Sequence, residues 1–331
     1  MRRLLAALLC AATFLCLCAC GHESDESPAL LLRYADNQPK DYPTTKAAEY
    51  FAQLVEERTG GQIRIRVYAD AALGDEISVF RQLQFGGIDF ARASVGTLAG
   101  FVPEMEILQL PYLFEDAEHM WRVLDGEIGE ELLGTIANAG VVGLSWFDAG
   151  ARNIYTRVPV KSLDDLEGLT IRVQESDLMS RMIRLWGAAP VQMPYGEVYS
   201  ALQTGRIDGA ENNWPSYEAT GHYEAAPYYL LDAHSRLPEA QLVSQITMDK
   251  IRALNPDYKG LLLTCAMEAA LYERELWQER ERASEALVRA SGCIVTEPST
   301  DELARFREAV QPLYGGFSEP VQRLVERIQQ S

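Results

Sequence analysis

The chain has 331 residues, of which 47% are apolar and 24% are charged, so it can bury a sizeable core and we expect two domains rather than one. This composition excludes a wholly disordered protein. Because 48 Asp and Glu residues outnumber 30 Lys and Arg residues, for a net charge of −18, the chain repels polyanions, which argues against nucleic-acid binding.

The N-terminal residues 1–20 have the layout of a secretory signal. Arg2 and Arg3 precede an apolar run, 4–17, and small residues follow. The run is shorter than the roughly 20 residues that span a bilayer, so we expect an exported, periplasmic protein. Residues 17–21 (LCACG) resemble a lipoprotein cleavage box in which Cys20 would be acylated and form a lipid anchor; a plain cleaved signal is the alternative.

Loss of the signal removes Arg2 and Arg3 and takes the net charge from −18 to −20. Residues 21–28 are polar and are predicted to be a solvated tether.

After the tether, strands and helices alternate. Residues 30–35 are predicted to be a buried strand, and a helix then begins at Pro43 and ends before the glycine pair at 60–61. A strand with alternating apolar residues follows at 63–68. Asp75 is expected to cap a helix that runs to residue 85, and 88–93 is another strand. This β-α-β-α-β order predicts a mostly parallel sheet with helices on both faces.

An internal repeat is the most informative feature of the sequence. Residues 83–91 (LQFGGIDFA) recur as 202–210 (LQTGRIDGA), and a short strand precedes each copy, at 63–67 and 170–173. One repeat of this length is too long for a solenoid. It indicates two α/β domains of similar construction, with chance similarity of two helix-Gly-strand corners as the alternative.

Polar residues follow both copies of the repeat. Arg92 and Ser94 come after the first copy, and residues 211–214 (ENNW) come after the second. Ligands of open α/β sheets bind beyond the carboxyl ends of the strands. The sequence therefore predicts a ligand cleft between two lobes.

The C-terminal third is predicted to be mostly helical. A helix over 256–290 carries alternating charges and is long enough to brace both lobes.

Cys265 and Cys293 could form a disulfide in an oxidising compartment, but the apolar surroundings of Cys265 favour a buried free thiol. Since the four histidines are scattered singly, no metal-ligand spacing is present, and we predict no metal or other cofactor.

The mature chain resembles the periplasmic solute-binding proteins of tripartite ATP-independent periplasmic (TRAP) transporters, of the dicarboxylate-binding-protein type. The segments that carry this resemblance are 62–65, 73–76, 110–114, 168–173, 193–199 and 209–212. The resemblance implies an α/β, two-lobed periplasmic-binding-protein-like fold with mixed, mostly parallel sheets and long C-terminal helices. It also implies an organic anion that is bound in the cleft without reaction and is delivered to the membrane subunits.

We place the lobe boundaries from this resemblance. Lobe I is expected to comprise 29–149 and 238–277, and lobe II 150–237 and 278–305. Residues 306–331 are expected to be a C-terminal helix.

The resemblance assigns the ligand carboxylate to Arg172, which lies in the strand motif at 170–173. Guanidinium is always charged, and its planar fork fits a carboxylate bidentately. By the same resemblance, Arg152 is a second cationic contact and Asn212 is an amide contact.

Further candidate contacts resemble the uronate and sugar-acid binders of this family. Asn213 would pair with vicinal hydroxyls and Trp214 would cover a sugar face, joined by Glu76, Arg92, Ser94 and His234. Each of three has a structural alternative: a helix N-terminal carboxylate for Glu76, a hydrogen-bonded hinge residue for His234, and a packing residue for Trp214.

We therefore predict a TRAP solute-binding protein for a hexuronate such as glucuronate or galacturonate, without catalytic residues. A C4-dicarboxylate binder of the same family is one alternative. Another is an exported sugar-acid enzyme that would use Glu76 and Glu211 as acid and base, although no nucleophile motif or phosphate loop is present. A sensor subunit would have the same fold.

Overall fold

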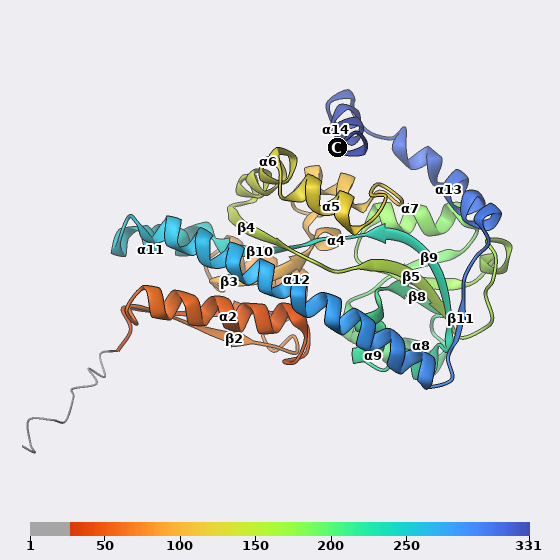
Figure 1. The fold of residues 1–331 in the computed structure, drawn as a ribbon, viewed down its shortest axis with the longest axis horizontal. Helices are drawn as coiled ribbons and strands as arrows, with labels where there is room; N and C mark the ends of the chain where they lie inside the picture. The colour runs from red at the N-terminus through yellow and green to blue at the C-terminus, as the bar shows by residue number, and fades with distance from the viewer. Residues whose placement is uncertain (1–26) are drawn as a thin grey trace, which may run out of the picture.

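We describe the fold from a computed structural model that places residues 27–331. The predicted signal, Cys20 and most of the predicted tether lie outside the described residues. The described chain forms two β-sheets, one in each half of an elongated molecule, with helices packed around them (Figure 1). This arrangement confirms the two-lobed α/β fold.

The first sheet has five strands in the order β2-β1-β3-β10-β4. Their bounds are Leu30–Ala35 for β1, Ile63–Tyr68 for β2, Phe90–Ser94 for β3, Val141–Phe147 for β4 and Glu239–Ser244 for β10. β1 is parallel to β2 and β3, whereas β10 is antiparallel to both of its neighbours. The chain therefore returns to this sheet after it has built five of the six strands of the other one, and it adds the sixth, β11, later.

The predicted helices of the first half are present. Helix α2 (Pro43–Arg58) begins at the proline, and α3 (Glu76–Gln84) begins after Asp75, whose carboxylate accepts a hydrogen bond from the Ser78 amide at 2.7 Å. Strand β3 begins two residues later than expected, at Phe90.

The second sheet has six strands in the order β11-β9-β5-β8-β6-β7. Their bounds are Ala151–Thr156 for β5, Thr170–Val173 for β6, Ala189–Gln192 for β7, Gly209–Asn212 for β8, Tyr228–Arg236 for β9 and Ile294–Thr296 for β11. β6 is parallel to β7 and β8, and β5 is antiparallel to β8 and β9. Both sheets are thus mixed.

The two copies of the internal repeat form the same helix-to-strand corner, one in each sheet. Each copy ends a helix with a glycine in the left-handed region, Gly86 at φ 68° and Gly205 at φ 73°, where other residues are strained. The aspartate of each copy accepts a hydrogen bond from a strand amide. Asp89 binds the amide of Arg33 at 2.8 Å, and Asp208 binds that of Thr170 at 2.9 Å. The two corners are therefore built by the same contacts.

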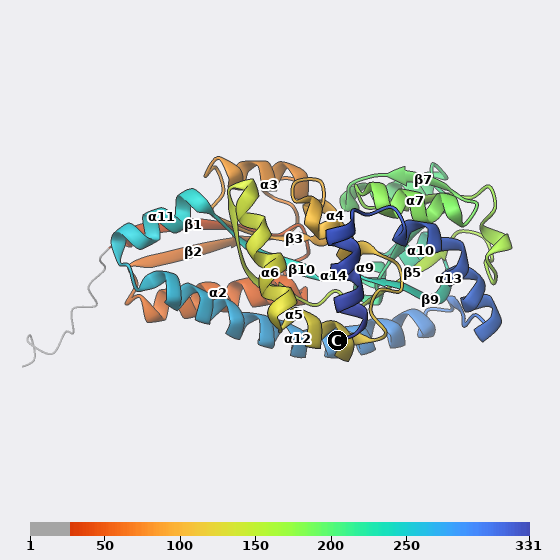
Figure 2. The same ribbon diagram turned by 90° about the horizontal axis from the view of Figure 1, so that it is seen from above.

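Two chain segments, 148–150 and 237–238, cross between the sheets, and helix α12 (Tyr258–Ala290) runs along both halves (Figure 2). It packs against α2 in one half and α9 (Trp214–Ala219) in the other.

Cys265, in this helix, and Cys293, beyond its end, are free. Since the helix rises about 1.5 Å per residue, the two thiols are roughly 40 Å apart, which confirms the free-thiol interpretation.

The C-terminal region differs from its prediction. In place of one helix over 306–331, the structure has α13 (Thr300–Tyr314) and α14 (Glu319–Gln329). Two glycines at 315–316 and Pro320 interrupt the helical run. α13 packs on α7 (Asp177–Leu185) in the second half, whereas His119 in the first half contacts the Ile328 carbonyl of α14 at 2.7 Å. The pair therefore bridges the two halves.

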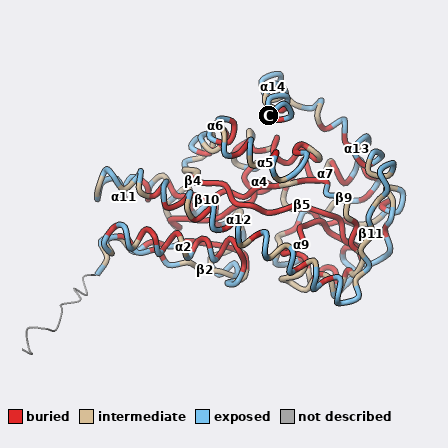
Figure 3. Tube along the Cα trace, in the orientation of Figure 1, coloured by how far each residue is buried: buried red, intermediate tan, exposed pale blue. Residues whose placement is uncertain are grey.

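The remaining described α-helices are α4 (Val95–Leu98), α5 (Ala117–Leu124), α6 (Glu127–Thr135), α8 (Val198–Thr204), α10 (His222–Ala225) and α11 (Gln245–Leu254). Most strands of the two sheets lie in the buried interior, whereas the edge strands β7 and β11 have no buried residue, and the helices present exposed residues outward (Figure 3). Among the described residues, no helix combines the length and hydrophobicity that crossing a membrane requires.

Candidate ligand-binding site

A cavity of about 400 Å³ lies between the two halves, where strands of both sheets end. Its volume is within the roughly 300–1,000 Å³ of small-molecule sites. Six of the nine predicted site residues line it: Glu76, Arg92, Arg152, Arg172, Asn212 and Asn213. The other three, Ser94, His234 and Trp214, are not part of the lining.

Arg172, on β6, is a buried cation that the protein does not neutralise. Its Nε and Nη2 donate to the Met193 carbonyl at 2.9 and 2.6 Å, and its exposed fraction is 2%. No carboxylate of residues 27–331 lies within 4.0 Å of it, whereas both other cavity-lining arginines form buried ion pairs. Burial accordingly lowers the pKa of Arg172 below its usual value. A ligand carboxylate would supply the missing counter-charge.

Arg152, on β5, is already paired with a carboxylate. Its Nη2 donates to Glu211 Oε1 at 2.8 Å, and its Nη1 donates to Asn212 Oδ1 at 2.9 Å. Burial would raise the pKa of Glu211, but Arg152 and His234 lower it to about 2. Glu211 therefore stays ionised and offsets the charge of Arg152.

His234 lies behind this pair, outside the cavity. Its Nδ1 is 2.8 Å from Asp232 Oδ2 and its Nε2 is 3.4 Å from Glu211 Oε2. Burial opposes its charge, but Asp232 and Glu211 raise the pKa of His234 to about 9. This arrangement fits the predicted hydrogen-bonded hinge residue better than a ligand contact. The two carboxylates hold a charged imidazole ring inside the protein.

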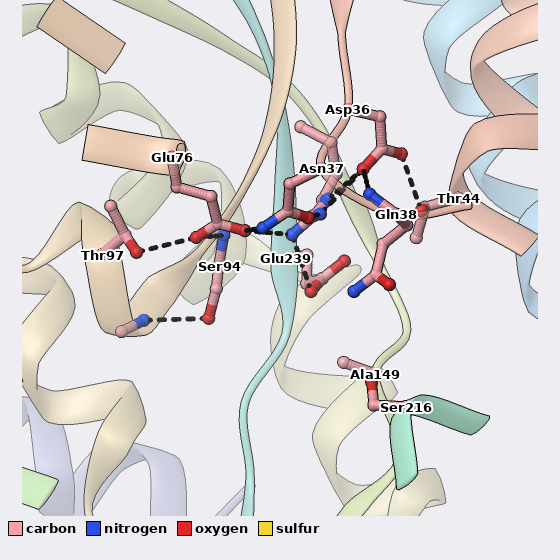
Figure 4. Close-up of polar contacts among 12 residues, drawn as sticks. Asp36, Asn37, Gln38, Thr44, Glu76, Ser94, Thr97, Ala149, Ser216 and Glu239 are labelled. Atoms are coloured by element: carbon pink, nitrogen blue, oxygen red, sulfur yellow. Dashed lines mark hydrogen bonds and ion pairs between the residues drawn. The ribbon is translucent and has the colours of Figure 1, made fainter. Parts of the chain in front are cut away.

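Arg92, on β3, is surrounded by acids in the first half of the cavity. Figure 4 shows these acids, Asp36, Glu76 and Glu239, on the same side of the cleft. It contacts Asp36 at 2.7 Å, Glu239 at 3.1 Å and Glu76 in a short ion pair. One positive charge thus faces three carboxyl groups. Arg92 is not available as a second site for a ligand carboxylate.

The neighbouring amides Asn212 and Asn213 have different roles. Asn212 Oδ1 accepts from Arg152 and from the Asn213 amide, and its Nδ2 has no hydrogen bond to any described residue. Asn213 caps α9 by accepting from the Ser216 amide at 2.8 Å and donates its Nδ2 to the Ala149 carbonyl at 2.8 Å. Of the two side chains, that of Asn212 is the better placed for a ligand.

Trp214 and Ser94 have structural roles. The Trp214 ring is 5% exposed and stacks on Tyr229 with centroids 3.9 Å apart, so it covers no sugar face. Ser94 accepts from the Gly96 amide to cap α4 and lies 3.0 Å from Gln174 Oε1 across the cleft.

Several lining residues were not predicted from the sequence, among them Asn37, Gln38, Gln174, Tyr195 and Glu239. A signal for two of them was available. Asn37 and Gln38 lie two and three residues beyond the end of β1, and polar residues beyond a strand end are the same signal that points to Arg92 and Asn212. Tyr195 lies within the segment 193–199 that carries the family resemblance, and it is an aromatic residue of the cavity lining.

Comparison with known proteins identifies the family. Residues 34–319 match the bacterial extracellular solute-binding proteins, family 7. The chain belongs to this family. These proteins are periplasmic solute-binding subunits of TRAP transporters, so the chain is a periplasmic transport component rather than an enzyme.

Solved structures of other family members have the same fold. The TRAP solute-binding protein of Xanthobacter autotrophicus, with bound β-D-galacturonate, is 40% identical over 91% of this chain and 99% of its own, with a TM-score of 0.87. That of Chromohalobacter salexigens, with bound D-glucuronate, is 38% identical over 90% and 99%, also with 0.87. A more distant member from Sulfurospirillum deleyianum, with bound succinate, is 27% identical over 91% and 99%, with 0.85.

Proposed function

We propose that this family member captures a hexuronate, such as glucuronate or galacturonate, or a closely related sugar acid, and delivers it to the membrane subunits of a TRAP transporter. One observation carries the proposal. The cavity holds an uncompensated guanidinium at Arg172, while the arginine at its other end, Arg92, is saturated by three carboxyl groups. This polarity suits a ligand with one carboxylate and many hydroxyls.

The ligand carboxylate would pair with Arg172 and contact Asn212 Nδ2. Arg152 would support it from behind, although Glu211 offsets its charge. Hydroxyl groups can donate to the oxygens of Glu76 and exchange hydrogen bonds with Asn37 and Gln38. The ring of Tyr195, whose hydroxyl is already engaged with the Ser216 carbonyl at 2.9 Å, would provide an apolar surface for the sugar.

A C4 dicarboxylate fits this charge distribution less well. Its second carboxylate would face the acidic cluster around Arg92, and burying an anion without a cationic partner costs several kcal/mol. The relatives that carry galacturonate and glucuronate are also more similar to this chain than the relative that carries succinate.

Lobe closure would accompany binding, with lobe I comprising 29–149 and 238–277 and lobe II comprising 150–237 and 278–305. The two halves touch across the cleft: Tyr42 and Ser216 hydroxyls are 2.9 Å apart, and Ser94 lies 3.0 Å from Gln174. Contacts of this kind can form only when the lobes approach, so they would stabilise the closed state together with the ligand.

Lipid anchoring through Cys20 is part of the proposal. It rests on the cleavage-box pattern at 17–21 alone. Mass spectrometry of the mature N-terminus tests it: we expect a diacylated Cys20 in the wild type, and a Cys20→Ser variant should lose both the lipid and membrane retention. An unmodified N-terminus in the wild type would mean that residues 1–20 are an ordinary cleaved signal peptide without a lipid anchor.

Calorimetric titration with glucuronate, galacturonate, succinate and malate tests the ligand class. We expect at least one hexuronate to bind at least tenfold more tightly than either dicarboxylate, a difference of about 1.4 kcal/mol. If succinate bound more tightly than both hexuronates, the sugar-acid proposal would be wrong, while membership of the solute-binding family would stand.

A further inference from the structure

Glu239, the first residue of β10, is a buried carboxyl group of the cavity with one unpartnered oxygen. It is 7% exposed, and its Oε1 accepts from Arg92 Nη1 at 3.1 Å. Its Oε2 is buried and has no hydrogen-bond partner among the described residues. A buried carboxylate oxygen without a donor is costly when it is charged.

The other two carboxyl groups around Arg92 are well solvated by the protein. Asp36 accepts from the Thr44 and Thr45 hydroxyls at 2.8 and 3.1 Å, besides its ion pair. Glu76 accepts from the Thr97 hydroxyl at 2.7 Å and from Asn37 Nδ2 at 3.2 Å. Hydrogen bonds of this kind stabilise the ionised form. Asp36 and Glu76 are therefore the anions of the cluster.

The net charge of these neighbouring groups determines whether Glu239 is protonated. With Asp36 and Glu76 ionised, two negative charges already outnumber the single positive charge of Arg92. A third negative charge, on Glu239, would therefore be buried without a compensating cation. Burial raises the pKa of Glu239 to about 8, and Glu76 and Asp36 contribute to the increase although Arg92 opposes it. The wider set of ionisable groups that interact with Glu239 consists of Asp36, Tyr34, Tyr42, Glu76, Arg92, Arg152 and Glu273.

Gln38, another residue of the cavity lining, also has a side-chain oxygen without a partner among the described residues. Gln38 Oε1 is buried and makes no hydrogen bond within residues 27–331. A protonated Glu239 offers a hydrogen-bond donor, and Gln38 Oε1 offers an acceptor. A ligand hydroxyl is the group that can accept from one and donate to the other, whereas a ligand carboxylate can only accept.

We propose that Glu239 carries a proton in the ligand-free protein at neutral pH and, together with Gln38, forms a subsite for a hydroxyl group at the end of the ligand opposite its carboxylate. The inference rests on the proposed sugar-acid function and adds a consequence to it: binding depends on a proton held by the protein. Affinity should fall as the pH rises and Glu239 ionises, because the donor is lost and a negative charge appears beside the hydroxyls.

The test compares hexuronate affinity between pH 7 and pH 9 for the wild type and Glu239→Gln, with Glu49→Gln, an exposed change in α2, as a matched control. For a group that titrates near pH 8, the wild type and the control should lose about tenfold in affinity over this range. Glu239→Gln keeps a donor of the same shape without a titratable proton. It should bind at pH 7 within about threefold of the wild type and lose less than about threefold by pH 9. An equal loss in Glu239→Gln and in the wild type would overturn the proposal, as would a wild-type affinity that does not fall.

A second measurement separates this inference from the proposed function. Carbon NMR of the ligand-free protein with labelled glutamate should show one carboxyl group that titrates near pH 8 and is absent from Glu239→Gln. If the wild type bound no hexuronate, the proposed function would fail, but the protonation of Glu239 would still be decided by this spectrum. The absence of such a titration would refute the protonation outright.

Discussion

Replacing Arg172 by lysine tests the central feature of the site. In the wild type, Nε and Nη2 are anchored on the Met193 carbonyl, and Nη1 has no described protein partner. The guanidinium can therefore bind a ligand carboxylate while it keeps its anchor. A lysine ammonium retains the charge, but a point-like group cannot reproduce this planar fork.

The expected loss can be estimated from hydrogen bonds. If lysine forfeits one charge-assisted bond, either to the carbonyl or to the ligand, about 1.5–3 kcal/mol is lost. This corresponds to a roughly 10- to 150-fold weaker affinity for the best hexuronate. The folded protein should tolerate the change, since charge and approximate volume are kept.

Isothermal titration calorimetry on the wild type and Arg172→Lys measures the effect. Arg184→Lys, an exposed change on α7 in the same half of the molecule, is the matched control and should leave the affinity within twofold. Melting temperatures of the ligand-free variants check that both remain folded. If Arg172→Lys also stayed within twofold of the wild type, Arg172 would not bind the carboxylate.

Three other changes can be measured directly. Small-angle scattering at saturating hexuronate should give a smaller radius of gyration than the ligand-free protein, because the ligand completes contacts from both lobes; identical curves would indicate a preformed site. Asn213→Ala should lower the free energy of unfolding by about 1 kcal/mol through loss of the α9 cap, and it should weaken hexuronate binding less than Asn212→Ala does; the reverse order would mean that the Asn213 amide contacts the ligand after all. His234, whose folded pKa of about 9 lies above its unfolded value of roughly 6.5, stabilises the fold fully below pH 6.5 and loses about 3 kcal/mol of that contribution as the pH rises to 9. Denaturant titrations of His234→Gln should show a weaker fall in stability over that window, and an unchanged slope would contradict a charged His234.

The fold was predictable because its signals are local. The proline at the start of α2, the Asp75 cap and the repeat at 83–91 and 202–210 each act through neighbours in sequence or through one strand beside them. The C-terminal region shows the limit of such reasoning. The glycines at 315–316 were visible in the sequence, but the division into α13 and α14 also depends on docking against two distant parts of the chain.

The sequence predicted which residues line the candidate site better than it predicted what each of them does there. Arg92, Arg152 and Arg172 all line the cavity, yet only Arg172 lacks a carboxylate partner among the described residues. The partners of Arg92 come from positions 36, 76 and 239, which lie in the loop after β1, in α3 and in β10. Sequence spacing contains no information about which buried arginine is neutralised, because that depends on side chains brought together only by the folded sheets.

This pairing explains how a protein with a net charge of −18 can bind an anion. Charges on solvated faces are screened beyond roughly 8 Å at physiological salt, so the groups within the cavity decide. Two of the three lining arginines are offset by their own carboxylates, which leaves one cation whose burial is not compensated until a carboxylate arrives. Arg172 is buried in a structure whose halves already touch across the cleft. Closing the lobes without a ligand would therefore leave a bare charge in the interior, whereas closing them around a carboxylate would not. The same residue would thus provide affinity for the anion and make the closed state depend on it.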